Sequence, residues 1–480
     1  MEVLQRTANR GSISTGYDID NSLKFEEDNT EMMEQNPSAG GNRRTFTVSL
    51  WMKRSEISTT GNSQWIIGAI GASETAALSI DPSDVIFLDV GLGSTRNRMG
   101  TTQVFRDTSA WYHLVWRVDT TQGTAADRNR LYVNGVLAPL TAVDGYPTQN
   151  FECEYNNDKL INIGHYQAVN NNGLCGYLAE IHSCDGVSNA PTEFGEFDAD
   201  SGIWKPKAYA GSYGAQGFYL PLDNSSDLGA NSKGNSVDFT LQNITAADQS
   251  TDTPTNNFCT LNPLNRNSAT ASNNPTYTEG NTRTTGTLNG YWQTAIASIG
   301  VTSGKWYMEG QLIYDPQMAG IGVGDFGDIE NWGRNNDWIG AGKAVAYGTP
   351  KAEVGDSLPA TANDYTNSNI IGVALDADNG KVYWSRDNIY QSSMNPVTGA
   401  NGISIPTGGD AEGLYMFGVS GYKATHGSYT GNVGWLVNFG GFTNISISSA
   451  ASDANGYGTF EYAPPSGYYA LCTKNLAEFG

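Results

Sequence analysis

The sequence predicts an all-β protein made of two β-sandwich domains in tandem. One hairpin pattern occurs twice, at 111–137 and at 371–384: an alternating apolar strand, an Asn-Gly turn, and a strand with aromatic residues. Asn and Gly tolerate the positive φ angles of a type I′ turn, so this pattern is a strong hairpin signal. The composition agrees, because 57 Gly, 25 Tyr and 11 Trp with only 16% charged residues among 480 are typical of a loop-rich β protein. We expect little helix.

The strands of the first domain follow in order from residue 16, after a short polar arm at 1–15. Residues 16–25 indicate a first strand. In the next strand Phe46, Val48, Leu50 and Met52 alternate with Thr45, Thr47, Ser49 and Trp51, so it can pack on both faces. Short runs between Gly, Asn, Asp and Pro turns predict further strands at 65–70, 85–90, 160–163 and 177–181. We place this domain at 16–200.

The composition of residues 201–283 differs from that of the first domain and predicts an extended connector. Islands such as 204–207 and 217–220 stand among Asn, Ser, Thr and Gly. Aromatic residues and Leu are too frequent for a solvated linker, so we expect the connector to lie along the domain surfaces. The second domain is placed at 284–450, with strands at 306–309, 321–324, 371–384, 414–419 and 435–440. Pro and Gly in 451–480 predict an extended C-terminal strap.

Charge and cysteine usage exclude several classes of partner. A formal net charge of -22 opposes binding to nucleic acid or to an anionic membrane, since both require a cationic surface. Cys153, Cys175, Cys184, Cys259 and Cys472 are widely spread without a Cys-x-x-Cys pair, so we expect buried, reduced thiols. Residues 1–15 lack the apolar core of a signal peptide, and no stretch is long enough to span a membrane. The sequence predicts synthesis in a cytoplasm without membrane insertion.

Several of these strands resemble known modules. Residues 46–51, 111–115, 131–135 and 176–181 resemble laminin-G-like, concanavalin A-like jelly rolls, and the likeness covers most of 16–190. Residues 303–307, 371–376 and 437–440 resemble a SPRY domain, which is another concanavalin-like sandwich. The resemblance implies two tandem concanavalin A-like jelly-roll β-sandwiches joined by an extended connector.

A narrower resemblance concerns tailed-bacteriophage virion proteins. Residues 193–198, 204–207, 217–221, 259–264 and 469–476 resemble a family usually described as tail-fibre or other particle proteins. This implies a virion component, made in the cytoplasm of a host bacterium, that contacts other virion proteins and assembles symmetrically, a trimer being one such assembly. The first strand begins too early for a fibre shaft, so we expect a compact protein. A short, compact adhesin and a capsid decoration protein are both consistent with this expectation.

Alternating carboxylates raise the question of glycoside hydrolysis. Residues two apart on a strand lie about 6.5–7 Å apart, near the roughly 5–9.5 Å that glycosidases use. Glu152 with Glu154, and Glu196 with Asp198, alternate in this way, but neither pair lies in the Glu-x-Asp-x-x-Glu signature of laminarinase-like enzymes. We interpret them as solvated or edge-strand carboxylates and expect no enzyme. A polysaccharide depolymerase is the enzymatic alternative.

Two other catalytic patterns are weak. Residues 322–327 read as Gly-x-Gly-x-x-Gly, but a dinucleotide site requires a helix directly after this motif, and the following residues are loop-like. We expect these glycines to relieve crowding between strands. His113, His165, His182 and His426 are not accompanied by a Gly-x-Ser-x-Gly elbow. His113 alternates with apolar residues in a strand and is interpreted as structural.

Calcium is the only metal that the spacing suggests. Asp119, Asp127 and Asn129 near the first hairpin, and Asp376 with Asp378 at the second, offer hard oxygen ligands. Asp and Asn also cap their own backbone in such turns, and no EF-hand spacing occurs. Turn chemistry is therefore the preferred interpretation, and no cofactor is expected.

Two polar loops are the candidate glycan-binding sites. Sugars present apolar C–H faces to aromatic rings and hydroxyl groups to amides. The better loop contains Trp332, Arg334, Asn335, Asn336, Asp337 and Trp338, and the second contains Asn170, Asn171 and Asn172. An inward-facing Trp332 or Trp338 in the protein core is the competing interpretation. The sequence as a whole favours a virion adhesin that binds host-surface glycan or protein without catalysis, with a decoration or tail-accessory protein as the structural alternative.

Overall fold

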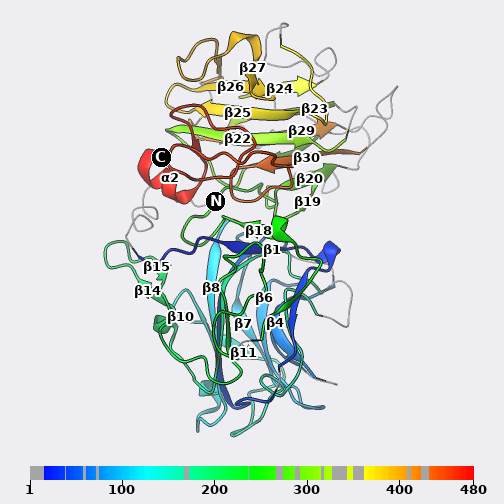
Figure 1. Cartoon of the computed structure of the whole chain (residues 1–480), viewed down its shortest axis with the longest axis vertical. Helices are drawn as coiled ribbons and strands as arrows, with labels where there is room; N and C mark the ends of the chain where they lie inside the picture. Colours follow the sequence, from blue (N-terminus) through cyan, green and yellow to red (C-terminus); the bar gives the residue numbers. More distant parts are fainter. Residues whose placement is uncertain are drawn as a thin grey trace. The chain divides into compact units, whose positions relative to one another are not determined.

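The computed structural model of the chain describes residues 16–37, 39–57, 61–71, 75–166, 172–235, 237–265, 274–286, 292–314, 318–326, 343–349, 362–407, 412–422 and 432–480. These residues fall into two compact units, which divide between Thr255 and Asn256. Each unit consists of antiparallel sheets with short connecting loops (Figure 1). The two units are called the first unit and the second unit.

The first sheet of the first unit is built around β3 and β13. Its strands, in spatial order, are β10 (Val136–Leu137), β9 (Asn129–Val133), β8 (Trp111–Asp119), β3 (Thr45–Arg54), β13 (Gly176–Asp185), β1 (Ser22–Phe25) and β18 (Gln249–Ser250), and β16 (Phe218–Leu220) also pairs with β13. The bounds of β3 agree with the predicted strand. β1 is shorter than predicted, because 16–21 form no strand; Ile19 N–H instead donates to Thr255 Oγ1 at 3.1 Å.

The second sheet of the first unit completes the sandwich. Its strands, in spatial order, are β11 (Leu140–Ala142), β7 (Arg98–Val104), β6 (Val85–Val90), β5 (Thr75–Ile80), β4 (Gln64–Ile70), β12 (Ile161–Ile163), β2 (Met32–Gln35) and β17 (Thr240–Gln242). The strands predicted at 65–70, 85–90 and 160–163 correspond to β4, β6 and β12. A separate two-stranded sheet pairs β14 (Gly195–Phe197) with β15 (Trp204–Pro206).

β3 is buried on both faces, as its alternation predicts. Phe46, Val48, Leu50 and Met52 lie in the main core between the two sheets. On the opposite face, the Thr47 hydroxyl donates to the Val187 carbonyl at 2.9 Å. The Trp51 ring stacks on the His113 ring there, with ring centroids 4.7 Å apart. The outer face of this sheet is therefore covered by later parts of the same chain.

The segment at 201–283 is divided between the two units. Up to Thr255 it supplies β15, β16, β17 and β18 to sheets of the first unit. From Asn256 it supplies β19 (Thr276–Thr278) and β20 (Arg283–Gly286) to the second unit. The connector is thus ordered where the structure describes it, and it forms short strands that pair with strands of both units.

The second unit has a large and a small sheet. The large sheet runs β19, β20, β30 (Val433–Asn438), β22 (Lys305–Leu312), β25 (Ile370–Asp376), β26 (Lys381–Arg386) and β27 (Ile389–Tyr390), with β28 (Ile403–Ser404) beside β26 and β31 (Tyr469–Ala470) beside β22. The small sheet runs β21 (Trp292–Ile296), β29 (Tyr415–Tyr422), β23 (Met318–Asp325) and β24 (Ala344–Thr349). A single continuous core joins both sheets.

The two predicted hairpin turns differ. In the first, Asn134 and Gly135 have φ values of 49° and 78° and form a two-residue loop, as a type I′ turn requires. In the second, Asp376 pairs with Lys381, which leaves a four-residue loop in which only Gly380 has a positive φ, of 58°. The prediction of a type I′ turn is therefore wrong for the second hairpin, where the Asp376 carboxylate accepts the Asn379 N–H at 3.1 Å.

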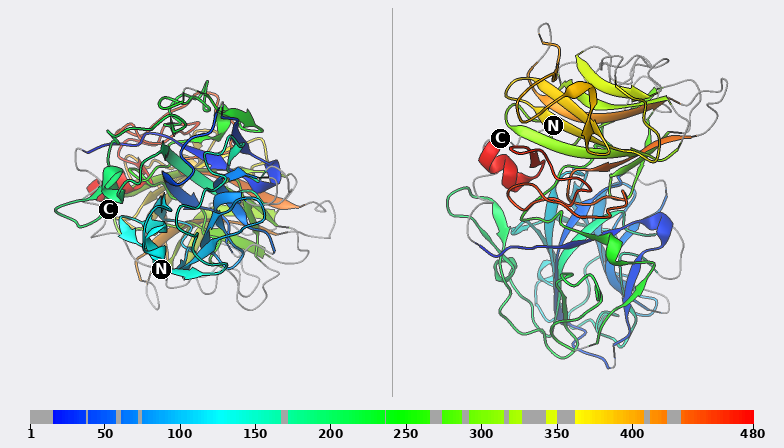
Figure 2. Two further views of the ribbon diagram at one scale, coloured as in Figure 1. Left: turned by 90° about the horizontal axis from the view of Figure 1, so that it is seen from below. Right: turned by 45° about the horizontal axis from the view of Figure 1, so that its top comes forward.

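Two buried carboxylates organise the C-terminal strap: Glu309 joins it to the rest of the second unit, and Asp453 joins two parts of the strap to each other. Glu309 on β22 accepts hydrogen bonds from the backbone N–H groups of Glu461 and Tyr462 at 3.0 and 2.8 Å. Asp453 accepts from Ala470 N–H at 2.9 Å and from Asn475 Nδ2 at 2.7 Å. β31 then pairs parallel to β22, and the short helix α2 (Thr473–Phe479) follows. Figure 2 shows this segment in dark red and red beside the green and yellow strands.

Among the described residues, the other helical elements are short 3-10 helices. They are η1 (Glu27–Asn29), η2 (Ala125–Asp127), η3 (Pro191–Glu193), η4 (Ala246–Asp248) and η7 (Gln391–Ser393). All five cysteines are free and buried, as predicted. Among the described residues no helix has the length and apolar character needed to cross a membrane.

Candidate binding rim and metal-ligating cluster

One rim of the first unit gathers chemically active side chains from distant parts of the chain. The end of β1, the end of β3 and the start of β13 meet there, because Gly176 pairs with Phe25 on one side and with Arg54 on the other. The Ser55 N–H then donates to the Cys175 carbonyl at 3.0 Å. We call this edge, formed by 26–31, 55–64 and 164–175, the first-unit rim; 58–60 and 167–171 lie outside the described residues.

Asn172 is the one described residue of the two predicted glycan loops, and it lies in this rim. Its Oδ1 accepts the Ser63 N–H at 3.2 Å, and its carbonyl accepts the Trp65 N–H at 3.3 Å. An antiparallel bridge between His165 and Gly173 closes the base of the loop. These contacts to Ser63 and Trp65 give Asn172 a structural role.

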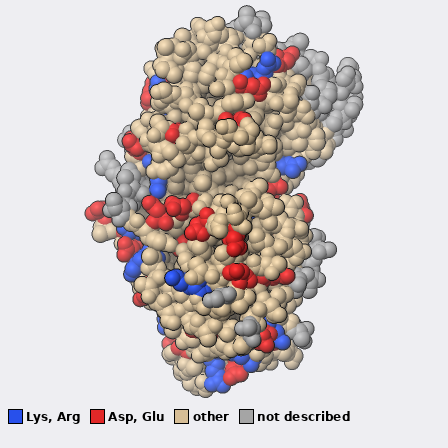
Figure 3. Space-filling model, in the orientation of Figure 1, with Lys and Arg blue, Asp and Glu red and all other residues tan. Residues whose placement is uncertain are grey.

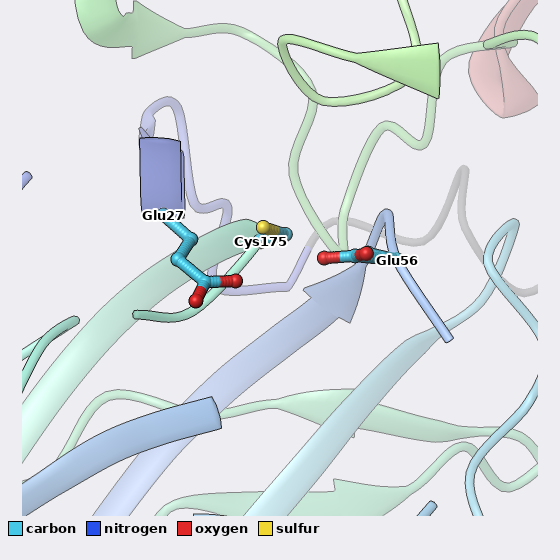
Figure 4. Close-up of side chains that lie close together, drawn as sticks. All are labelled: Glu27, Glu56 and Cys175. Atoms are coloured by element: carbon cyan, nitrogen blue, oxygen red, sulfur yellow. The ribbon is translucent and has the colours of Figure 1, made fainter. Parts of the chain in front are cut away.

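A thiol and two carboxylates come together beside this loop. Glu27 begins η1, Glu56 follows β3, and Cys175 precedes β13; one potential ligand atom from each lies within 4.8 Å of the other two. Figure 4 shows the Cys175 side chain between the two carboxylates. A fourth acidic group is close, because the Cys175 thiol donates to Glu26 Oε1 at 3.4 Å. Thiolate and carboxylate groups are metal ligands, so this cluster could hold a cation.

The electrostatics of the cluster favour protonated groups when no cation is present. Burial, followed by the charges of Glu56 and Asp28, raises the pKa of Glu27 to about 7. Burial and the charges of Glu26 and Glu56 raise the pKa of the Cys175 thiol well above its ordinary value. Glu56 is exposed at the surface, and Cys175 is buried. The cluster is thus open to solvent on the Glu56 side.

His165 lies next to this cluster. Its side chain is 1% exposed, and its Nδ1 is hydrogen bonded to the Tyr166 carbonyl at 2.9 Å. Its Nε2 is buried without a hydrogen-bond partner among the described residues. A Cβ atom on Gly173 would lie 2.8 Å from His165 Cδ2 and 2.8 Å from Glu27 Cα. The Cδ2 atom of the ring therefore packs close to Gly173, beside the backbone of Glu27.

The other predicted glycan-binding residues lie outside the described residues. These are Trp332, Arg334, Asn335, Asn336, Asp337, Trp338, Asn170 and Asn171. Neither loop is tested by the structure, and both remain predictions.

The carboxylates considered for catalysis are held by neighbouring groups. Glu152 forms ion pairs with Arg43 and Arg44 at 3.2 and 2.8 Å. Glu154 is 4% exposed and accepts from Asn157 Nδ2 at 2.6 Å. The two side chains are thus held by different partners.

The second carboxylate pair shares one lysine. The Lys205 ammonium lies 3.6 Å from Glu196 and 3.1 Å from Asp198. Asp198 also accepts the Ser201 N–H at 2.9 Å, and these hydrogen bonds hold its pKa well below the ordinary value. A carboxylate of this kind stays ionised and cannot protonate a leaving group at neutral pH.

The described histidines other than His165 serve packing and hydrogen bonding. His113 contacts Ser49 Oγ through Nε2 at 2.9 Å and accepts from Trp204 Nε1 at 3.0 Å; burial lowers its pKa to about 3. His182 lies between Tyr213 Oη, at 2.8 Å, and Glu180 Oε2, at 3.3 Å. The structural interpretation of His113 is confirmed, and His426 is outside the described residues.

The Gly-x-Gly motif at 322–324 lies within β23, as expected for a strand rather than a dinucleotide loop. A Cβ on Gly322 would lie 2.0 Å from the Val345 carbonyl of β24. The glycine therefore permits close approach of two strands, as the sequence suggested; 327–330 lie outside the described residues.

The candidate calcium ligands are engaged in turns. Asp119 accepts from Thr121 Oγ1 at 2.6 Å, and Asn129 Oδ1 accepts from Trp116 Nε1 at 2.8 Å. Asp127 pairs with Arg130. At the second hairpin Asp376 forms an ion pair with Lys305 at 3.0 Å, and Asp378 accepts the Gly304 N–H at 2.8 Å. These contacts agree with the turn interpretation.

Sequence reasoning missed the cluster at the first-unit rim. Glu27, Glu56, His165 and Cys175 are separated by 29, 109 and 10 positions, so no ligand spacing marks them. Only the acidic run Glu26-Glu27-Asp28 directly after a strand was visible, and such runs are usually solvated.

The comparisons with known proteins concern the fold. Residues 28–190 match the family model described as Concanavalin A-like lectin/glucanases superfamily. The first sandwich is similar to this family. The predicted fold class is confirmed: the described residues are nearly all-β and form several antiparallel sheets, and the likeness to concanavalin A-like proteins covers the first sandwich. No curated protein sequence matches the chain.

Three solved structures are among those similar to the chain. The pentraxin from Limulus polyphemus, a native heptamer, is 14% identical, with 37% of this chain and 82% of that chain covered and a TM-score of 0.27. The SPRY domain of human HERC1 is 11% identical, covering 37% and 96%, with a TM-score of 0.25. Domains LG4-5 of the mouse laminin alpha1 chain are 9% identical, covering 87% and 85%, with a TM-score of 0.30. We draw no functional conclusion from likenesses at these scores.

Proposed function

We propose that this protein is a non-catalytic adhesin of a tailed-bacteriophage virion that binds glycan or protein on a host surface. The observation that carries the binding role is the match of 28–190 to a family of lectins and glucanases. In this domain the carboxylates considered for catalysis contact arginine, lysine and asparagine side chains. A lectin-like role fits such a domain better than hydrolysis.

The hydrolytic alternative requires one carboxyl group to hold a proton while the other is ionised. Glu152 is ion paired with two arginines, and Glu154 is buried and accepts a hydrogen bond from Asn157. Lys205 lies between Glu196 and Asp198, and hydrogen bonds hold the pKa of Asp198 well below its ordinary value. The side chains of both pairs are thus engaged by neighbouring groups, which favours the non-catalytic role.

Recognition would use the polar loops at the ends of the sandwiches. The predicted loops are the one at 170–172, of which Asn172 contacts Ser63 in the first-unit rim, and the one at 331–338. Much of the protein surface is uncharged, as the face in Figure 3 shows, and amide and hydroxyl groups on such a surface can hydrogen bond to sugar hydroxyls. Each site would bind weakly, and many copies on one particle would multiply the effect.

The virion location rests on the motif resemblance. In this chain those motifs have structural roles: β14 and β15 pair with each other, β16 pairs with β13, and β31 pairs with β22. They would preserve an architecture shared by particle proteins, without forming the recognition site itself. Other virion proteins and further copies of this chain are the partners that this location implies.

The test is binding of the fluorescently labelled full chain, free and clustered on beads, to a panel of bacteria and their purified surface polysaccharides. Saturable binding to some strains, competed by their own polysaccharide, would support the adhesin. No binding by the clustered protein to any strain would overturn it in favour of a decoration protein. Release of new reducing ends from the polysaccharide would overturn the non-catalytic role.

Loop variants locate the site. The double variant W332A/W338A and, separately, N170A/N171A should lower bead binding at least about tenfold if either loop carries recognition. The matched control is Ile389→Ala, because Ile389 is 70% exposed in the second unit and lies in neither loop. Unchanged binding by both loop variants would exclude both loops as recognition sites.

A further inference from the structure

We propose that two copies of this chain associate through one edge of the first unit. The edge consists of residues 136–143, which we call the crossing edge. In this association β10 pairs antiparallel with β10 of the second copy, about a two-fold axis at Leu137. The proposal does not depend on the adhesin role, because it concerns how the chain associates with itself and not what it recognises.

The crossing edge is the outermost segment of both sheets in the first unit (Figure 1). β10 is the last strand of the first sheet and pairs with β9, and β11 is the last strand of the second sheet and pairs with β7. Between them, the Ala138 N–H donates to the Leu131 carbonyl at 2.8 Å, and the Thr102 N–H donates to the Pro139 carbonyl at 3.1 Å. Among the described residues no strand pairs with the outer side of this segment.

Exposed apolar side chains gather on and beside the crossing edge. Val136 and Leu137 are 61% and 49% exposed, and Val143 is exposed at the end of the segment. Val104, at the end of the neighbouring strand β7, is exposed as well. Within the part of the chain that the structure describes, eight large hydrophobic side chains are exposed, and half of them lie here. Apolar side chains concentrated in one place mark a surface that another molecule covers.

A fifth exposed apolar side chain, that of Phe197, extends this surface. Its ring packs edge-on against Trp204, with ring centroids 4.8 Å apart. A Cβ on Gly135, in the turn that precedes β10, would lie 2.3 Å from the same Trp204 ring. Trp204 therefore joins Phe197 to the start of the crossing edge.

The crossing edge lacks the charges that usually protect an edge strand. Residues 136–143 read Val-Leu-Ala-Pro-Leu-Thr-Ala-Val and contain no charged side chain. Natural sheets prevent association at their edges with charged residues, proline or bulges, and Pro139 is the one residue of this kind in the segment. An uncharged apolar edge is suited to pairing with another strand.

The backbone of Leu137 favours a second copy of this chain as the partner. The Ala138 N–H is bonded to β9, so Leu137, one position earlier, directs its own N–H and carbonyl away from β9. Neither group has a hydrogen-bond partner among the described residues. One donor and one acceptor on the same residue can form two hydrogen bonds with that residue in a copy related by a two-fold axis. Pro139 has no N–H and its carbonyl is already bonded, so a longer strand of another protein would gain little more.

The charge distribution also favours a second copy at this edge. Residues 96–144, which include β7 to β11, carry six arginines and four aspartates, a net charge of +2, whereas the whole chain carries -22. Nearby arginines are paired within the same copy: Arg98 lies 2.6 Å from Asp89, and Arg130 is paired with Asp127. Two copies of a strongly acidic chain repel each other. That repulsion is least where the facing surfaces carry no net negative charge, as here.

The first experiment is analytical ultracentrifugation of the full chain over a wide range of concentrations. We expect a concentration-dependent dimer. Val136→Lys combined with Leu137→Lys places like charges on both sides of the two-fold axis and should raise the dimer dissociation constant at least about tenfold. The matched control is Ile389→Lys combined with Val397→Lys, at two exposed apolar positions of the second unit, and it should leave the dimer unchanged.

Cross-linking tests the two-fold axis directly. Directly opposite residues in a hydrogen-bonded antiparallel pair have Cα atoms about 5.5 Å apart, which a disulfide can span. Leu137→Cys should therefore give a covalent dimer under mild oxidation at least about tenfold faster than Val397→Cys. The five natural cysteines are buried, so the introduced thiol is the accessible one.

A further variant keeps the test decisive if the double lysine variant fails to fold. Phe197→Ser changes an exposed side chain outside the crossing edge and should raise the dissociation constant about threefold or more, with melting temperatures confirming that the variant is folded. A chain that stays monomeric at every concentration would assign the edge to a strand of another protein and overturn the proposal. A dimer unchanged by the lysine substitutions, or equal cross-linking rates for the two cysteine variants, would also overturn it.

Discussion

The carboxylate of Glu309 accepts the backbone N–H of Tyr462 at 2.8 Å, which joins a strand at the centre of the second unit to the C-terminal strap. Asn438 Nδ2, at 3.1 Å, and the Glu461 N–H, at 3.0 Å, donate to the same carboxylate. Burial nevertheless dominates these bonds and raises the pKa of Glu309 to about 7.

The stability of the second unit should therefore decrease as the pH rises from 5 to 8. A carboxyl group with a raised pKa in the folded state stabilises the fold fully below its ordinary pKa of 4.5 and loses that contribution as the pH passes 7. The shift corresponds to about 3 kcal/mol. Urea unfolding at several pH values, for the chain and for Glu309→Gln, checks this: the variant should show a smaller decrease. An equal pH dependence in both proteins would contradict the prediction.

Removal of the Asp453 carboxylate should loosen the C-terminal strap, because Asp453 joins two parts of the strap to each other. Asp453→Ala leaves the Ala470 N–H and Asn475 Nδ2 without their acceptor in a buried place, and we expect a loss of about 2–4 kcal/mol. Limited proteolysis should then cleave within 451–480 at least tenfold faster. A tenfold change corresponds to about 1.4 kcal/mol. Glu478→Gln, at an exposed position of α2, is the control. Equal cleavage rates for the two variants would show that Asp453 does not hold the strap.

The buried ion pair of Lys53 and Asp252 should couple the segment that follows β18, which contains Asp252, to β3, which contains Lys53. The two groups lie 2.7 Å apart and each is 1% exposed, and Trp111 Nε1 also donates to Asp252 at 3.1 Å. Lys53→Met leaves a buried carboxylate without its cation and should cost about 3–5 kcal/mol, whereas Lys53→Met with Asp252→Asn should cost less than the sum of the single changes. Calorimetric melting of the three variants measures this coupling. Additive losses would mean that the pair contributes no net interaction.

Gly135 should be much less tolerant of a side chain than other turn glycines. It has a φ of 78°, and a Cβ there would lie 2.3 Å from the Trp204 ring. Gly93 has a φ of 61° with no atom within 4 Å of its Cβ position, so Gly93→Ala reports the backbone strain alone, about 1 kcal/mol. Gly135→Ala should cost about 1–3 kcal/mol more, because Trp204 must move. Melting temperatures of both variants check this, and equal shifts would contradict it.

The sequence predicted those parts of the fold that depend on local pattern. β6 has the predicted bounds of 85–90. The core face of β3 carries the residues that the alternation indicated: Phe46, Val48, Leu50 and Met52. The prediction of a strand was wrong for 16–21, although Ile19 is buried. The Ile19 N–H donates to a side chain and not to a neighbouring strand. β16, β17 and β18 have two or three residues each, too few for any periodicity to be detected.

The candidate site was hidden from sequence for a different reason. Glu27, Glu56 and Cys175 lie together only because β1, β3 and β13 are neighbours in one sheet, although these three strands are far apart in the chain. The second hairpin shows a local failure, since the Asp376 side chain selects a longer loop than the Asn-Gly pair suggests.

The late edge strands also determine when each unit can finish folding during synthesis. β17 and β18 complete both sheets of the first unit with residues 240–250, so a nascent chain that has left the ribosome only as far as residue 190 would expose the edges of β2 and β1. Unpaired edges recruit other strands. The second unit gains β31 only after residue 470 has emerged, so its central strand β22 must wait longest for its last partner. Fragments cut at 190 should aggregate, and fragments that extend to 255 should not.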